Sequence, residues 1–114
     1  MVDVDPDRFE ELVGDALDSI PPELGRLIDN VAVFVDNDAP AGRLYGLYQG
    51  IPLTRREAYG GLAMPDRITI FRRTICRDCA SDADVIDQVR KTVVHEVAHH
   101  FGIDDARLRE LGYG

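Results

Sequence analysis

One short pattern near the C-terminus constrains this chain more than any other feature: HExxH, formed by His95, Glu96 and His99. On a helix, residues four apart lie on one face, so the two histidines can place ring nitrogens on one cation. Glu96 points roughly 100° away from His95 at the helical period. Its carboxylate would then lie beside the metal, where it can take a proton from a water held there. The pattern therefore predicts a zinc hydrolase site.

HExxH also occurs by chance on helices, so the surrounding residues matter. With His95 at 0° and roughly 100° per residue, Gln88, Thr92 and His99 fall between about 0° and 60°. The arc from about 80° to 260° is apolar and holds Val85, Ile86, Val89, Val93, Val94, Val97 and Phe101. A polar strip on a mostly buried helix must face a cavity, a metal or polar partners. The pattern favours the metal, whereas His100, near 140° among the valines, is predicted to be a core-edge histidine with a hydrogen-bonded ring rather than a ligand.

Two aspartates compete for the third ligand position. Gly102 can end the helix in a left-handed conformation and turn the chain back toward the metal. Asp105 is then in reach, six residues after His99. An aspartate at a helix start is also expected to cap that helix, and Asp104 suits the cap better because it directly precedes an apolar-periodic stretch. Asp105 is left as the ligand by elimination, with Glu110 as a further candidate, and two histidines with one carboxylate keep a fourth position open for water.

The chain as a whole limits the class of protein. A length of 114 residues predicts one small domain that spans residues 1–114. The formal net charge of −8 argues against nucleic acid and anionic membranes as partners. No stretch approaches the roughly 18 apolar residues of a membrane-spanning helix. The acidic N-terminus lacks the basic and apolar regions of a signal peptide, so we expect a cytoplasmic protein.

Apolar periodicity predicts the elements around the site. Helices are predicted at residues 6–19, 22–28, 82–101 and from 104 or 105 to 111. Buried strands are predicted at residues 31–35, 44–48 and 67–71, and a long connection at 51–66. Ser81 and Asp84 form a capping box for the long helix, which is on the order of 30 Å in length. The last helix should bury Leu108 and Leu111.

The two cysteines form one CxxC motif, Cys76 to Cys79. Half of a second zinc site would need two further ligands, and the chain has no other cysteine. A redox pair would need a βαβ setting, which the pattern does not indicate. The favoured interpretation is therefore two thiols in the turn before the long helix.

Residues 95–105, HEVAHHFGIDD, match the HExxHxxGxxD form of the signature seen in metzincin-like peptidases. From about Leu44 to Gly112 the chain more closely resembles the small bacterial zincin-like metallopeptidase family of minimal zincins. The segments that carry this resemblance are LYQGIPL at 47–53, PDRITIFR at 65–72 and VRKTVVHE at 89–96. The resemblance implies an α+β fold, in which a small twisted sheet packs on a backing helix and a long active-site helix. It also implies that His95, His99 and Asp105 bind Zn²⁺ and that Glu96 is the general base.

The chain departs from true metzincins, which have a methionine turn under the metal. Only nine residues follow Asp105 and none is Met, so part of the cleft is expected to be absent or supplied by a partner chain. We expect a zinc metallopeptidase that acts on small or unstructured peptides. The resemblance implies that the peptide lies along an edge strand, for which the strand at 67–71 is the candidate. The alternative is a zinc-stabilised interaction module, in which Glu96 would have no use as a base. An additional oxyanion donor is expected among Tyr45, Tyr48, Tyr59 and Arg67.

Overall fold

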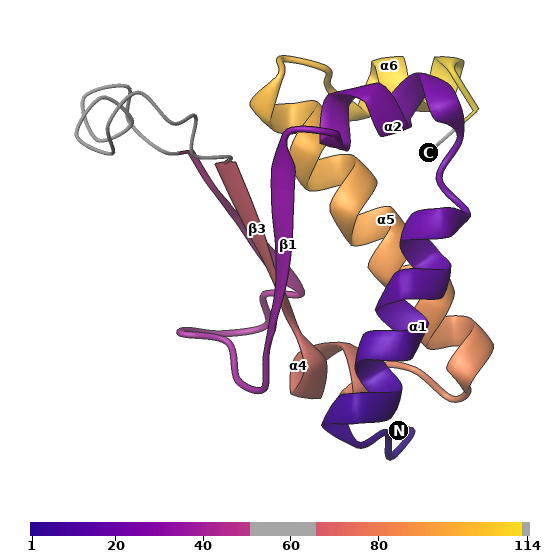
Figure 1. The fold of residues 1–114 in the computed structure, drawn as a ribbon, viewed down its shortest axis with the longest axis vertical. Helices are drawn as coiled ribbons and strands as arrows, with labels where there is room; N and C mark the ends of the chain where they lie inside the picture. The colour runs from indigo at the N-terminus through magenta and orange to yellow at the C-terminus, as the bar shows by residue number, and fades with distance from the viewer. Residues whose placement is uncertain (51–65, 113–114) are drawn as a thin grey trace.

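The computed structural model describes residues 1–50 and 66–112 and shows helices gathered on one side of a small sheet (Figure 1). The helices are α1 (Pro6–Asp18), α2 (Pro22–Ile28), α4 (Arg72–Arg77), α5 (Asp82–His100) and α6 (Asp105–Glu110). The strands are β1 (Val31–Asp36), β2 (Gly46–Gln49) and β3 (Asp66–Phe71). All predicted helices and strands are present, within two residues at either end. The predicted connection at 51–66 lies outside the described residues, except that Asp66 begins β3.

The three strands form a mixed sheet in the order β1-β3-β2. β1 runs parallel to β3, and β2 runs antiparallel to it. β3 is therefore the central strand, and the prediction that it is an edge strand was wrong. Ile68 and Ile70 alternate with Thr69 and Phe71, which resembled a half-buried strand, but all four side chains are buried. The edge strand next to α5 is β2, whose pairing with β3 is extended by a hydrogen bond from the Phe71 N–H to the Tyr45 carbonyl (2.9 Å).

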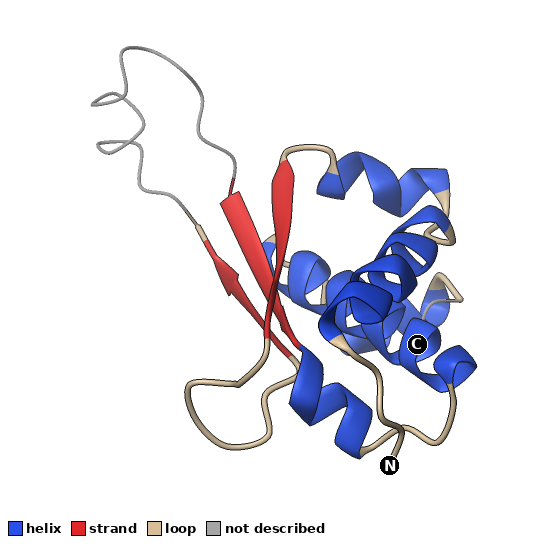
Figure 2. Ribbon diagram, turned by 60° about the horizontal axis from the view of Figure 1, so that its bottom comes forward, coloured by secondary structure: helices blue, strands red, loops and turns tan. Residues whose placement is uncertain are grey.

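One face of the sheet packs against α1 and α5, which also pack against each other (Figures 1 and 2). The largest side chains with no exposure in this core come from the helices and from β3: Phe9, Leu12, Ile68, Ile70, Ile75, Val85, Val89 and Val93. This is the small α+β arrangement that the resemblance implied, with α1 as the backing helix and α5 as the long helix. None of the helices within residues 1–50 and 66–112 is long and apolar enough to cross a membrane.

The cysteines lie differently from the prediction, because residues before the long helix form α4 rather than a turn. Cys76 belongs to α4, and Cys79 lies between α4 and α5. Six residues are too few to show a helical apolar period, which explains why the pattern did not predict α4. Both thiols are free and buried, and this burial raises the pKa of each thiol above its usual value.

The ends of the two C-terminal helices are more exposed than the periodicity predicted. Leu108 is fully buried as expected, but Leu111, which follows the last residue of α6, is 42 % exposed, so the prediction that it is buried was wrong. Phe101, which follows the last residue of α5, is 50 % exposed. At the other end of α5 the Ser81 half of the predicted capping box is confirmed, because the Ser81 hydroxyl accepts from the Asp84 N–H (3.2 Å). The Asp84 carboxylate accepts from the Ala80 N–H (3.0 Å) rather than from the Ser81 N–H.

Candidate metal centre

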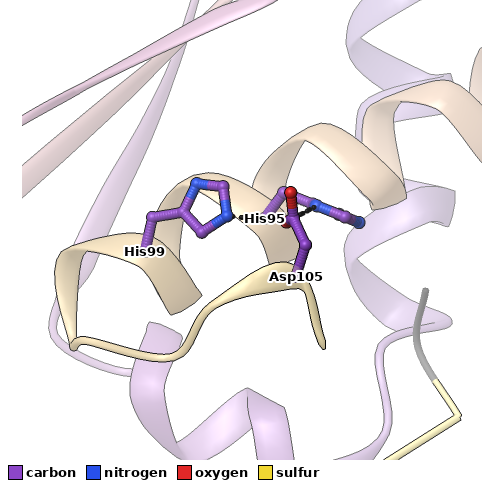
Figure 3. A group of neighbouring side chains, drawn as sticks. All are labelled: His95, His99 and Asp105. Carbon is purple, nitrogen blue, oxygen red and sulfur yellow. Dashed lines mark hydrogen bonds and ion pairs between the residues drawn. The ribbon is translucent and has the colours of Figure 1, made fainter. Parts of the chain in front are cut away.

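The polar strip of α5 contains one pair of side chains that hydrogen-bond to each other and one pair that does not. The Gln88 side-chain amide donates to the Thr92 hydroxyl (3.2 Å), and this hydroxyl donates to the Gln88 carbonyl (2.8 Å). These two polar side chains therefore satisfy each other within the helix. His95 and His99, one and two turns further on, have no such local partner on α5 and turn toward the start of α6 (Figure 3).

Gly102 makes this meeting possible. Its φ of 80° lies in the left-handed region that favours glycine, and the chain reverses there. The N–H of the next residue, Ile103, donates to the Ala98 carbonyl (2.8 Å) and so closes the end of α5. Asp104 then caps α6, since its carboxylate accepts from the Arg107 N–H (2.8 Å). The prediction that Asp104 is the cap is confirmed.

Asp105, the first residue of α6, points its carboxylate back at both histidines. Its Oδ1 lies 2.7 Å from Nε2 of His99 and 3.2 Å from Nδ1 of His95 (Figure 3). One possible ligand atom from each of the three residues lies within 4.8 Å of the other two. Two imidazoles with one carboxylate are the donor set of many catalytic zinc sites, so these residues fit a zinc ion.

The electrostatics of the cluster suit this donor set. Hydrogen bonding, first to His99 and then to His95, holds the pKa of the Asp105 carboxyl below its usual value of 3.8. The carboxylate is therefore anionic at neutral pH, which is the form that binds a metal. All three side chains are partly exposed, so solvent and substrate can reach them.

Glu96 lies on the side of α5 that lines a hollow of about 430 Å³ between this helix and the chain that enters β2. His95 lines the same hollow, so one of the proposed ligands and Glu96 open onto one space. The remaining lining residues are Arg43, Leu44, Tyr45, Gly46, Gln88, Lys91 and Thr92. Sequence analysis missed Arg43, Gly46 and Lys91, although a glycine inside a strand does indicate a close backbone approach.

At Gly46, β2 lies close against α5. A Cβ atom at this position would lie 2.8 Å from Cγ2 of Thr92 and 3.1 Å from the Thr69 carbonyl oxygen. No residue other than glycine fits there without movement of the Thr92 side chain or of the backbone around it. The edge strand is therefore held directly against the helix that carries His95 and Glu96.

The candidate oxyanion donors are engaged elsewhere. The Tyr45 hydroxyl donates to Asp78 (2.6 Å), which raises the pKa of Tyr45 above its usual value. The Tyr48 hydroxyl donates to Asp66 (2.8 Å), and the Arg67 guanidinium lies 4.3 Å from the ring centroid of Phe34. Tyr59 lies outside the described residues. The geometry therefore does not identify an oxyanion donor among Tyr45, Tyr48 and Arg67.

His100 is kept out of the cluster by contacts with the sheet. Its ring stacks on Tyr48 with centroids 4.0 Å apart, and its Nε2 lies 3.7 Å from the Asp66 carboxylate. The ring lies outside the cluster, as predicted, but it is exposed and lies beside a carboxylate rather than being hydrogen-bonded at the edge of the core. Of the two adjacent histidines, His99 belongs to the cluster and His100 joins α5 to the sheet.

The comparisons with known proteins agree with this fold. The family model of the zincin-like metallopeptidases matches residues 28–114. The chain belongs to this family. A solved structure of a conserved hypothetical protein from Thermo thermophilus shares the fold, with a TM-score of 0.52, 21% identity, and coverage of 84% of this chain and 92% of that chain. No match was found among curated proteins.

Proposed function

We propose that this zincin-like metallopeptidase hydrolyses small or unstructured peptides, with zinc held by His95, His99 and Asp105. The observation that carries the proposal is the approach of three possible ligand atoms to within 4.8 Å of one another, next to a hollow that Glu96 lines. A zinc ion bound there would supply Lewis-acid chemistry, which polarises the substrate carbonyl and lowers the pKa of water.

Glu96, the two histidines and Asp105 would each have a separate role in this reaction. Glu96 accepts a proton from the attacking water on its carboxylate and delivers it to the leaving amine. The two histidines supply ring-nitrogen donors from one face of α5. Asp105 supplies the negative charge, which its lowered pKa keeps in place well below neutral pH.

The peptide would lie along β2, because β2 is the sheet edge beside α5. An edge strand presents unpaired N–H and C=O groups to an added strand. A substrate segment must be extended to pair there, which favours small or unstructured peptides over folded proteins.

One observation favours a second candidate function, a zinc-stabilised interaction module. The cluster joins the end of α5 to the start of α6, so a zinc ion would fix α6 in place even without catalysis. In that case the carboxylate of Glu96 beside the hollow would have no role.

The substitution Glu96→Gln separates the two functions, because it keeps the size of the side chain and removes the base. Hydrolysis of a pool of unstructured peptides, followed by mass spectrometry, should fall about 10²- to 10⁴-fold while zinc content stays unchanged. The matched control is Glu10→Gln, an exposed glutamate of α1, which should retain full activity. Equal hydrolysis by the Glu96→Gln and wild-type proteins would contradict catalysis by this site.

A further inference from the structure

The lining of the hollow beside Glu96 differs from the chain as a whole in its balance of acidic and basic side chains. The sequence has 21 acidic and 13 basic residues. The lining of the hollow instead contains two basic side chains, Arg43 and Lys91, and one acid, Glu96. A concave site with a basic rim attracts anionic groups of a ligand.

Arg43 is the basic side chain that is available to a ligand. Lys91 Nζ lies 3.1 Å from the Asp87 carboxylate and is already paired. Arg43 is exposed and forms no hydrogen bond or ion pair with any residue in the described part of the chain. The positive charge of Arg43 helps to lower the pKa of Asp78, but the Asp78 carboxylate already accepts a hydrogen bond from the Tyr45 hydroxyl (2.6 Å). An exposed guanidinium offers a planar pair of donors that matches a carboxylate.

The direction of β2 indicates which part of a peptide would meet Arg43. Antiparallel pairing is slightly more stable per residue than parallel pairing. A peptide antiparallel to β2 runs from the Gln49 end of the strand toward the Gly46 end. Arg43 precedes Gly46 by three residues, so it lies at the end reached by the C-terminal part of the peptide.

We infer that Arg43 binds a peptide carboxylate on the C-terminal side of the cleaved bond, either an acidic side chain or the free C-terminus. The inference rests on the proposed function for the position of the peptide. It makes Arg43 a specificity-determining residue and anionic peptides the preferred substrates.

Binding to the zinc-loaded Glu96→Gln protein tests this inference without turnover. Three fluorescein-labelled peptides of equal length are compared by fluorescence anisotropy: one with a glutamate and an amidated C-terminus, one neutral with a free C-terminus, and one neutral and amidated. At least one of the first two should bind about tenfold more tightly than the third, and the peptide that does so identifies the source of the carboxylate. The added substitution Arg43→Gln should abolish this preference.

The matched control is Arg26→Gln on α2, which removes the same charge from another exposed arginine without an ion pair to any described residue. This protein should keep the preference. Equal binding of all three peptides, no binding, or a preference that survives Arg43→Gln would overturn the inference. Cleavage of the same peptides by the wild-type protein is measured separately. If none is cleaved but the preference depends on Arg43, the peptidase proposal fails and Arg43 remains a carboxylate-binding residue.

Discussion

Nε2 of His99 lies 2.7 Å from Oδ1 of Asp105, across the turn between α5 and α6. This contact depends on the backbone as much as on the side chains, because the turn passes through a left-handed glycine. It brings a carboxylate to the end of a helix whose histidines would otherwise face solvent. The zinc centre that we propose therefore depends on the turn between α5 and α6. Substitutions at the centre and next to it should show which residues bind zinc and which only lie nearby.

The three histidines should behave differently on substitution by alanine. The wild-type protein should bind about one zinc per chain, and His95→Ala or His99→Ala should each remove most of it. His100→Ala should retain zinc, because the His100 ring stacks on Tyr48 and lies outside the cluster. Metal content after dialysis, measured by mass spectrometry, checks all four proteins. Full zinc content in the first two variants would exclude this cluster as the zinc site.

Substitutions of the two adjacent aspartates should also differ in their effect on zinc binding. Asn can still cap a helix but is a poor zinc ligand, so Asp105→Asn should weaken zinc binding strongly and Asp104→Asn should not. Without metal, the two variants should unfold alike in urea, whereas complete loss of the cap in Asp104→Ala should cost about 1 kcal/mol. Competition with a chromogenic chelator measures the zinc affinity. Strong loss in Asp104→Asn alone would mean that the turn after Gly102 brings the other carboxylate to the metal.

Local sequence patterns predicted most of this centre. The helical period places His95 and His99 together, and capping chemistry assigns Asp104 to the start of α6. Both rules act over fewer than about five residues, so a single sequence contains all the information that they need. The position of Asp105 follows from the same turn.

Strand order could not be predicted in this way, because it depends on pairing between distant segments. β3 pairs with β1 on one side and β2 on the other, and no local feature of residues 66–71 reveals two partners. The same is true of the hollow, because Arg43 and Glu96 line one space only once β2 has packed against α5. The structure was therefore needed to show which strand forms the edge of the sheet and which residues line the hollow.

The Tyr45–Asp78 contact predicts a pH dependence of stability. The hydrogen bond from the Tyr45 hydroxyl is the main cause of the lowered pKa of Asp78, whose usual value is 3.8. A group with a lowered pKa in the folded state stabilises the fold above its unfolded pKa, and this contribution is lost as the pH falls through the folded pKa. Tyr45→Phe should raise the pKa of Asp78, which NMR titration measures, and should reduce stability at pH 7. The difference from wild type should shrink below about pH 4.

The control for this prediction is the same substitution in an Asp78→Asn background. An amide does not titrate in this range, so the effect of Tyr45→Phe on the urea midpoint should then be independent of pH. If the pH-dependent difference persisted without the carboxylate, its origin would lie in another group.

Gly46→Ala should destabilise the protein, because the new Cβ atom would lie 2.8 Å from Cγ2 of Thr92. Forcing a methyl group into a packed contact typically costs about 1–3 kcal/mol. The matched control is Gly14→Ala on α1, where nothing lies within 4 Å of the new Cβ atom. At this exposed helical position alanine should stabilise the protein by about 0.5–1 kcal/mol. Urea unfolding of both variants measures the free energies of unfolding.

A second substitution shows whether the loss at Gly46 comes from the contact with α5. Thr92→Ser removes Cγ2 and keeps the hydroxyl that donates to the Gln88 carbonyl. The double variant should recover part of the lost stability, with a coupling of about 0.5–3 kcal/mol between the two sites. Recovery should be incomplete, because the Thr69 carbonyl oxygen would still lie 3.1 Å from the new Cβ atom. Zinc content should stay unchanged throughout, since the proposed ligands come from α5 and α6 and none comes from β2. Strictly additive effects of the two substitutions would contradict close packing of β2 on α5 at this point, and with it the placement of the edge strand beside Glu96.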